Sequence, residues 1–129
     1  MSSNKNRPIS PHLDIYKLPL TALMSISHRI TGVGLGFGLV LMVLTLVAVA
    51  SGEERYISYQ VHLSAWYGQA VLVLFSFALY FHLCHGIRHL FWDAGAGFNK
   101  DDANKFSKLT IVAAVLLTLL TWFVALVTG

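Results

Sequence analysis

The chain has 129 residues, of which 56% are hydrophobic and 12% charged, and its formal net charge at pH 7 is +3. This composition is too apolar for an ordinary soluble globular domain, and the small basic excess gives no reason to expect nucleic-acid binding. The single cysteine, Cys84, excludes an internal disulfide.

Three stretches without Asp, Glu, Lys or Arg are each long enough to cross a bilayer. They are residues 30–52, 56–87 and 109–129. A hydrocarbon core of about 30 Å requires roughly 20 helical residues, and three spans are too few to close a barrel, so only helices satisfy the backbone in lipid. The remaining residues are too few to bury three such segments in a soluble core. The fold class predicted is an all-α membrane protein with three transmembrane helices.

The predicted elements follow one another within a single membrane-anchor domain. They are a proline-interrupted cytoplasmic segment at 1–20, helix one at about 21–50, an outer loop at 52–59, helix two at about 62–92, a cytoplasmic loop at 93–104 and helix three at about 105–127. Trp66 and Trp92 stand at the two ends of helix two, where aromatic residues suit the membrane interfaces.

The distribution of lysine and arginine predicts the orientation. The segment before helix one carries three such residues and the segment that begins at Arg88 carries four, whereas the outer loop has only Arg55. Because positively charged short loops stay on the cytoplasmic side, the N-terminus is predicted to be cytoplasmic and the C-terminus periplasmic. The N-terminal segment is not rich in Arg and Ser as a transit peptide is, so a bacterial inner membrane is expected rather than a mitochondrial one.

Four glycines alternate along helix one, at Gly32, Gly34, Gly36 and Gly38, and give two overlapping G-x-x-x-G spacings. Small residues let transmembrane helices approach closely. A phosphate-binding glycine loop would need a preceding strand and a polar setting, which this apolar span does not offer. The glycines are therefore predicted to pack against another helix.

Helix two carries three histidines, His82, His85 and His89, whose spacing of three and four residues places them on one stripe. Ionisable groups inside a span are costly and suggest a function. A neutral imidazole is a good axial ligand for haem iron, and Arg88 and His89 could pair with haem propionates. The spacing alone leaves proton relay, metal transport and plain hydrogen bonding open as alternatives.

Helix one carries a second set of polar residues, Ser25, His28 and Arg29, on one face near the same interface. The serine hydroxyl can donate to a quinone carbonyl, and the guanidinium can stabilise the negative charge that grows there on reduction. An interfacial arginine that snorkels to lipid phosphates, with a serine nearby, explains the same spacing equally well.

Two sequence blocks carry a family resemblance. The first is RPISPHLDIY at 7–16, followed by SISHRITG at 25–32, and the second is HLCHGIRHLFWD at 82–93. The blocks resemble the N-terminal signature and the H-x-x-x-G-I-R-H-L-x-W-D pattern of the cytochrome b subunit of succinate dehydrogenase, respiratory complex II. They occur in the family's order, and the resemblance covers essentially the whole chain.

The resemblance implies a haem b site. His82 corresponds to the axial ligand of the haem iron, and His28, Arg29 and His89 correspond to positions near the haem propionates. His85 departs from the family pattern, in which an apolar residue or Asn is usual. It lies one turn from His82 and could compete with it as a ligand, although the family match favours His82.

The resemblance also implies a ubiquinone site and a set of partners. Ser25 and Arg29 correspond to ubiquinone-binding residues, and Ile26 would border the quinone pocket. The complex implied has a flavoprotein subunit that oxidises succinate, an iron-sulfur subunit that relays electrons and a second membrane-anchor subunit that supplies the other haem ligand. This chain would be a membrane-anchor cytochrome b subunit of succinate:ubiquinone oxidoreductase.

Three other functions remain open. A haem-free structural anchor and a quinol:fumarate reductase anchor fit the same spans, and a histidine-lined transporter would need polar residues in all three. Helix three offers only threonines and Trp122, which disfavours the transporter. Neither a Ser-His-Asp set nor a zinc-type set nor a nucleotide loop is found, so the chain is not expected to catalyse dehydrogenation by itself.

Overall fold

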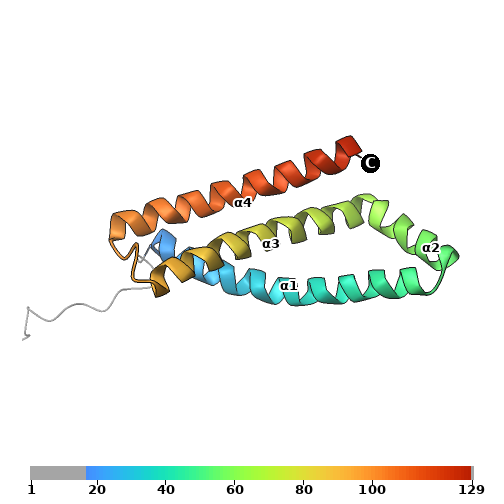
Figure 1. Cartoon of the computed structure of the whole chain (residues 1–129), viewed down its shortest axis with the longest axis horizontal. Helices are drawn as coiled ribbons and strands as arrows, with labels where there is room; N and C mark the ends of the chain where they lie inside the picture. Colours follow the sequence, from blue (N-terminus) through green and yellow to red (C-terminus); the bar gives the residue numbers. More distant parts are fainter. Residues whose placement is uncertain (1–16, 129) are drawn as a thin grey trace, which may run out of the picture.

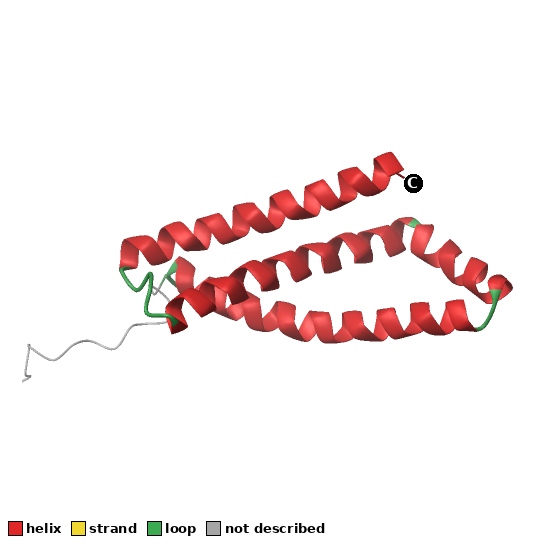
Figure 2. Cartoon of the chain, viewed as in Figure 1, coloured by secondary structure: helices red, strands yellow, loops and turns green. Residues whose placement is uncertain are grey.

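The structure, a computed structural model, describes residues 17–128 and contains four helices in that range. They are α1 (Leu20–Ala50), α2 (Glu53–Ser64), α3 (Trp66–Asp93) and α4 (Lys100–Thr128). Helices α1, α3 and α4 run alternately up and down, and α3 packs against both of the others (Figure 1). Short loops join consecutive helices, and α2 lies between α1 and α3 (Figure 2). Most of the predicted segment 1–20 lies outside the described residues.

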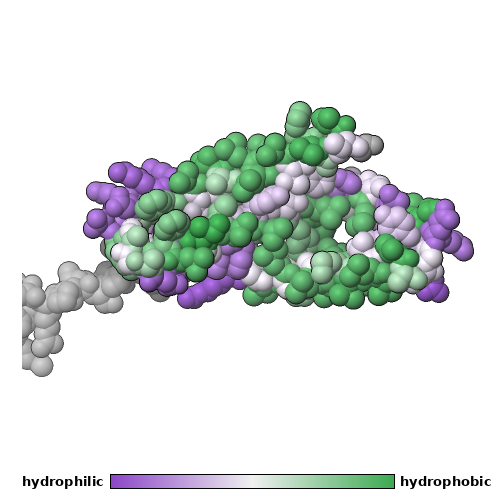
Figure 3. Space-filling model, in the orientation of Figure 1, coloured by the Kyte–Doolittle hydropathy of each residue, from purple (hydrophilic) through white to green (hydrophobic). Residues whose placement is uncertain are grey.

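Three of these helices, α1, α3 and α4, are long and apolar enough to cross a membrane. The shortest has 28 residues, which at about 1.5 Å per residue exceeds the hydrocarbon thickness of about 30 Å. Large apolar side chains such as Phe37, Leu74 and Leu120 are more than half exposed. Figure 3 shows apolar surface over the long middle of the molecule and hydrophilic residues toward its two ends. The prediction of an all-α protein with three spans is confirmed.

The stretch 52–59, predicted as a loop, is helical from Glu53 onward, so that part of the prediction is wrong. Glu53 and Glu54 occupy the first turn of α2, where negative charge is favourable beside the helix N-terminus. The hydroxyl of Tyr59 lies 3.0 Å from Oγ1 of Thr45 and ties α2 to α1. The charge-free stretch 56–87 already includes residues 56–64 of α2, so the absence of charge did not separate this short polar helix from the span that follows.

A bend at Ala65 separates α2 from α3. Its ψ of 155° is extended and interrupts the helix. Gly68 is buried at the bend, where an added Cβ atom would overlap the carbonyl oxygen of His62. The helix predicted at 62–92 therefore divides, and the apolar span begins at Trp66.

Helix α4 packs against α3 through small side chains. Its buried residues are Ser107, Thr110, Ala114 and Thr118, at helical spacings of three and four. The hydroxyls of Ser107 and Thr118 donate to carbonyls one turn earlier, at 2.7 and 2.8 Å, so their burial leaves no unpaired donor. Small residues of this kind allow close approach between helices in lipid.

The glycines of α1 follow the same rule in part. A Cβ atom at Gly32 or Gly38 would lie 3.0 Å from a ring atom of His82 or Phe75 on α3. At Gly34 and Gly36, an added Cβ would meet no described atom within 4 Å. Close packing against another helix is therefore confirmed at Gly32 and Gly38 and not at Gly34 or Gly36.

We expect Gly68→Ala to destabilise the fold, because the added methyl group cannot fit against α2 without a backbone shift. Overpacking of this kind costs about 1–3 kcal/mol, which a thermal unfolding series in detergent would detect. Gly34→Ala is the matched control, since an added Cβ there is unopposed and alanine favours helix. Equal stability of the two variants would show that the contact at Gly68 does not hold the bend.

Candidate functional site

Four of the six histidines gather at one end of the bundle, where α1 begins and α3 ends. The ring centroid of His28 lies 3.9, 4.6 and 5.5 Å from those of His82, His85 and His89. The antiparallel pairing of α1 and α3 produces this arrangement, because a residue early in α1 lies opposite the last turns of α3. The stripe predicted on α3 is thus completed by one residue of α1, and we call the four the histidine cluster.

His82 is held between α1 and α3. Its ring stacks on His28 at an interplanar angle of 14°, and its Nδ1 lies 3.3 Å from Oγ1 of Thr31. Gly32 leaves the space that the ring edge occupies. Nε2 makes no hydrogen bond within residues 17–128 and is not an enclosed atom. Sequence reasoning did not single out Thr31, although its place three residues after His28 puts it on the same helix face.

His85 occupies a different environment, because it is only 1% exposed. Neither of its ring nitrogens has a hydrogen-bond partner among the described residues. Its ring stacks on Phe81 at 5.9 Å and meets His89 edge-on at 4.8 Å. His85 would have to leave the interior of the bundle to reach any group that this chain shares with another subunit.

The histidine cluster fits a haem by its chemistry. A haem iron takes a neutral imidazole as axial ligand, and the accessible Nε2 of His82 is such a donor. His28 and His89 are half-buried beside it, and imidazole N–H groups can donate to carboxylates. Ligand nitrogens of His28, His85 and His89 also lie within 4.8 Å of one another. The Nε2 of His28 is buried without a described partner, which marks a polar site inside an apolar bundle.

The three predicted quinone residues lie on α1 beside the histidine cluster. Ser25 is half-buried, and Arg29 and Ile26 are exposed. At about 100° per residue, the three side chains leave α1 within an arc of about 100°. This arc lies to one side of the face that carries His28 toward α3. The structure therefore brings the three residues together on one side of α1, next to the face that meets α3.

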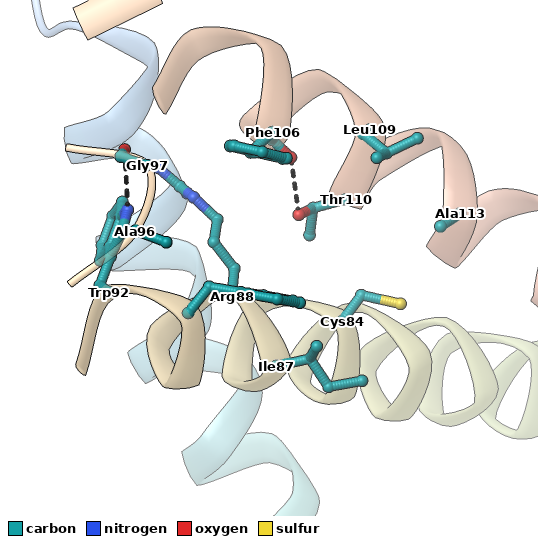
Figure 4. A pocket seen from close by; sticks show the side chains of 11 residues that line it. Cys84, Ile87, Arg88, Trp92, Ala96, Gly97, Phe106, Leu109, Thr110 and Ala113 are labelled. Carbon is teal, nitrogen blue, oxygen red and sulfur yellow. Dashed lines mark hydrogen bonds between the residues drawn. The ribbon is translucent and has the colours of Figure 1, made fainter. Parts of the chain in front are cut away.

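Arg88 turns away from this surface and lies between α3 and α4 (Figure 4). It is 4% exposed, its Nη2 donates to the carbonyl oxygen of Ala103 at 3.3 Å, and its guanidinium lies 4.1 Å from the centre of the Trp92 ring. This distance is typical of a cation–π contact. Arg88 borders a pocket of 390 Å³ between the two helices. Its guanidinium is therefore engaged on the α4 side, although Nε and Nη1 are buried without a hydrogen-bond partner among the described residues.

Beyond the histidine cluster, α1 and α3 diverge toward α2 (Figure 1) and border a cleft of 660 Å³. Gly32, Gly36 and Gly38 line it from α1, and Phe75 and Leu79 line it from α3. Cavities of roughly 300–1,000 Å³ accommodate cofactors and similar ligands. Gly32, which also lies against the ring of His82, is among the residues that line this cleft.

We expect His85→Leu to leave thermal stability unchanged or to raise it, because it removes two buried nitrogens that lack described partners. Met24→Ala, at the same end of the bundle and 3% exposed, should cost about 2–5 kcal/mol. Unfolding midpoints of the two variants in detergent give the comparison. A loss at His85→Leu as large as at Met24→Ala would mean that His85 is hydrogen-bonded in the assembled protein.

Comparison with known proteins places the chain in a family. Residues 3–121 match the family described as succinate dehydrogenase/fumarate reductase transmembrane subunit. The succinate dehydrogenase cytochrome b556 subunit of Paracoccus denitrificans is 42% identical over 119 residues, which is 92% of each chain. That of Rickettsia felis is 40% identical over 116 residues, 90% of each chain. The mitochondrial cytochrome b560 subunit of Bos taurus is 36% identical over 115 residues, 86% of this chain and 67% of that protein. The chain belongs to the succinate dehydrogenase/fumarate reductase transmembrane subunit family, which confirms the resemblance found in its sequence.

Proposed function

We propose that the chain is the membrane-anchor cytochrome b subunit of a succinate:ubiquinone oxidoreductase. It binds haem b together with a second anchor subunit, which supplies the other axial ligand, and it helps to form the site at which ubiquinone receives electrons from the iron-sulfur subunit. A flavoprotein subunit oxidises succinate. The observation that carries the proposal is the ring of His82, which stacks on His28 of α1 and lies 3.3 Å from Thr31 through Nδ1, so that Nε2 is left without a hydrogen-bond partner among residues 17–128.

The residues of this chain bind and orient the haem. His82 presents a neutral imidazole nitrogen on the side of the α1–α3 pair that a second anchor can reach. His28 and His89, whose rings lie 5.5 Å apart, and Arg29 supply donors for the propionates. When bound, haem b supplies one-electron transfer. The enclosed position of His85 supports His82 rather than His85 as the ligand.

Ubiquinone binds where Ser25, Ile26 and Arg29 face out of α1. The Ser25 hydroxyl donates to a quinone carbonyl, and the Arg29 guanidinium stabilises the charge that develops there on reduction. The exposed side chain of Ile26 gives the quinone ring an apolar wall. Because all three residues leave α1 on an open surface, the iron-sulfur subunit and the second anchor close the site.

The chain is oriented with its N-terminus in the cytoplasm and its C-terminus in the periplasm of a bacterium, across the inner membrane. Lys17, Lys100, Lys105 and Lys108 lie at the end of the bundle that holds the histidine cluster, whereas α2 at the other end carries Arg55 with two acidic neighbours. This asymmetry supports a cytoplasmic position for the histidine cluster, on the side where a soluble dehydrogenase docks. The similarity to a mitochondrial subunit makes a mitochondrial inner membrane the alternative.

A quinol:fumarate reductase anchor is the second candidate, because the matching family is described by both reactions. The named relatives are succinate dehydrogenase subunits and favour succinate oxidation. The reduction potential of the quinone that co-purifies with the complex distinguishes succinate oxidation from fumarate reduction. A low-potential quinol is needed to reduce fumarate, so a low-potential quinone would favour the fumarate reductase anchor.

The haem assignment predicts the spectra of two variants. We expect His82→Ala to remove most of the b-type absorption of the purified complex, because the iron loses one axial ligand, whereas His85→Leu retains it. Dithionite-reduced minus oxidised difference spectra, normalised to the flavin content of the complex, measure this. A wild-type complex without b-type absorption would favour a haem-free anchor, and loss at His85→Leu alone would reassign the ligand.

The quinone assignment predicts a selective loss of activity. Removal of one preorganised donor costs about 10²–10³-fold in rate, so Arg29→Leu should lower succinate:quinone reductase activity about 100-fold, and Ser25→Ala should lower it to a smaller extent. Succinate oxidation with a soluble artificial acceptor should stay unchanged in both. Arg55→Leu, at the opposite end of the bundle, is the control. Full quinone reductase activity in Arg29→Leu would move the site elsewhere.

A further inference from the structure

One hydrogen bond within residues 17–128 involves the ring of His82, and its partner is the hydroxyl of Thr31. The Oγ1 atom of Thr31 lies 3.3 Å from Nδ1 of His82 and 3.0 Å from the carbonyl oxygen of His28, one turn earlier in α1. The threonine thus connects the backbone of α1 to an imidazole of α3. We propose that Thr31 is a positioning residue for His82, which fixes the tautomer and the orientation of its ring. This inference rests on the proposed role of His82 as a haem ligand.

The tautomer follows from the number of hydrogens available. A threonine hydroxyl has one hydrogen, and Thr31 donates it to the carbonyl oxygen of His28, which can only accept. Its oxygen is then free to accept from Nδ1 of His82. A neutral imidazole has one N–H, and this contact places it on Nδ1. Nε2 therefore carries the lone pair, and it has no hydrogen-bond partner among residues 17–128.

The orientation follows from contacts on two sides of the ring. His28 stacks on one face of it at 3.9 Å, and Gly32 leaves so little room that a Cβ atom would come within 3.0 Å of Cε1. With Nδ1 held by Thr31, rotation of the ring about its Cβ–Cγ bond would break the hydrogen bond and the stack together. Thr31, Gly32 and His28 thus determine the plane in which an iron-bound imidazole would lie.

An acceptor on the second nitrogen of an iron-bound histidine makes the ligand more basic, and loss of such outer partners typically costs about 10–100-fold in metal affinity. We expect Thr31→Val, which has nearly the same shape, to weaken haem retention of the complex at least about tenfold in a dilution series. Its haem midpoint potential should rise, because a less basic ligand stabilises ferric iron less. Its low-spin EPR signal should shift or broaden, since this signal reports the relative orientation of the two axial imidazoles.

The controls separate a positioning role from a structural one. Thr31→Ser keeps the hydroxyl and should restore haem retention, potential and EPR signal. Thr45→Val removes a hydroxyl near the other end of α1, which donates to the carbonyl of Leu41 at 2.9 Å and contacts the Tyr59 hydroxyl at 3.0 Å but no histidine, and it should leave all three readouts at wild-type values. Flavin content and co-purification of the subunits show that each variant assembles.

Two results would overturn the inference: wild-type potential and EPR signal in Thr31→Val, or equal changes in Thr31→Val and Thr45→Val. His82→Ala, measured in parallel, distinguishes this failure from failure of the proposed function. If His82→Ala keeps its haem, the ligand assignment is wrong. If His82→Ala loses haem while Thr31→Val keeps the wild-type potential and EPR signal, the assignment stands and Thr31 has no positioning role.

Discussion

The arrangement of the bundle depends on the close approach of α1 to α3 at His28. An imidazole inside a bilayer has no water to pair with, so polar ring nitrogens must face protein rather than acyl chains. The ring of His28 lies within 5.5 Å of three other histidine rings. Gly32, which has no side chain, allows α1 to come near enough for His82 to reach Thr31. The two helices then part toward α2, and the cleft opens where this contact ends.

Small and weakly polar residues hold the three spans together, because lipid provides little hydrophobic driving force between helices. Among residues 17–128, the buried hydrophobic side chains are those of Met24, Phe81 and Ala114, and α4 contributes hydroxyls that pair within their own helix. Large aliphatic side chains face outward instead. A chain built in this way leaves much of α1 and α3 uncovered on one side, which suits an anchor that is completed by a second membrane subunit.

The proposed haem site and the proposed quinone site differ in how many of their contacts this chain supplies. Around His82 the chain supplies a stacked neighbour, a hydrogen-bond acceptor and a recess, so the ring is oriented before any cofactor arrives. Around Ser25 and Arg29 it supplies only side chains on an open helix face. The quinone pocket proposed there would take its shape from other subunits, whereas this chain alone supplies the contacts that orient the proposed haem ligand.

The amino-acid sequence by itself determined the three spans, the all-α class, the family and the set of histidines. These features follow from length, hydropathy and helical spacing, which are local properties. Only the tertiary structure decided that α2 is a helix packed on α1 through Tyr59, that Arg88 faces α4, and that His85 is enclosed while His82 stays accessible. Three histidines on one stripe of α3 are equivalent by spacing. The contacts of α1 and α4 with α3 bury His85 more fully than the other two, and these contacts form between segments that are distant in sequence.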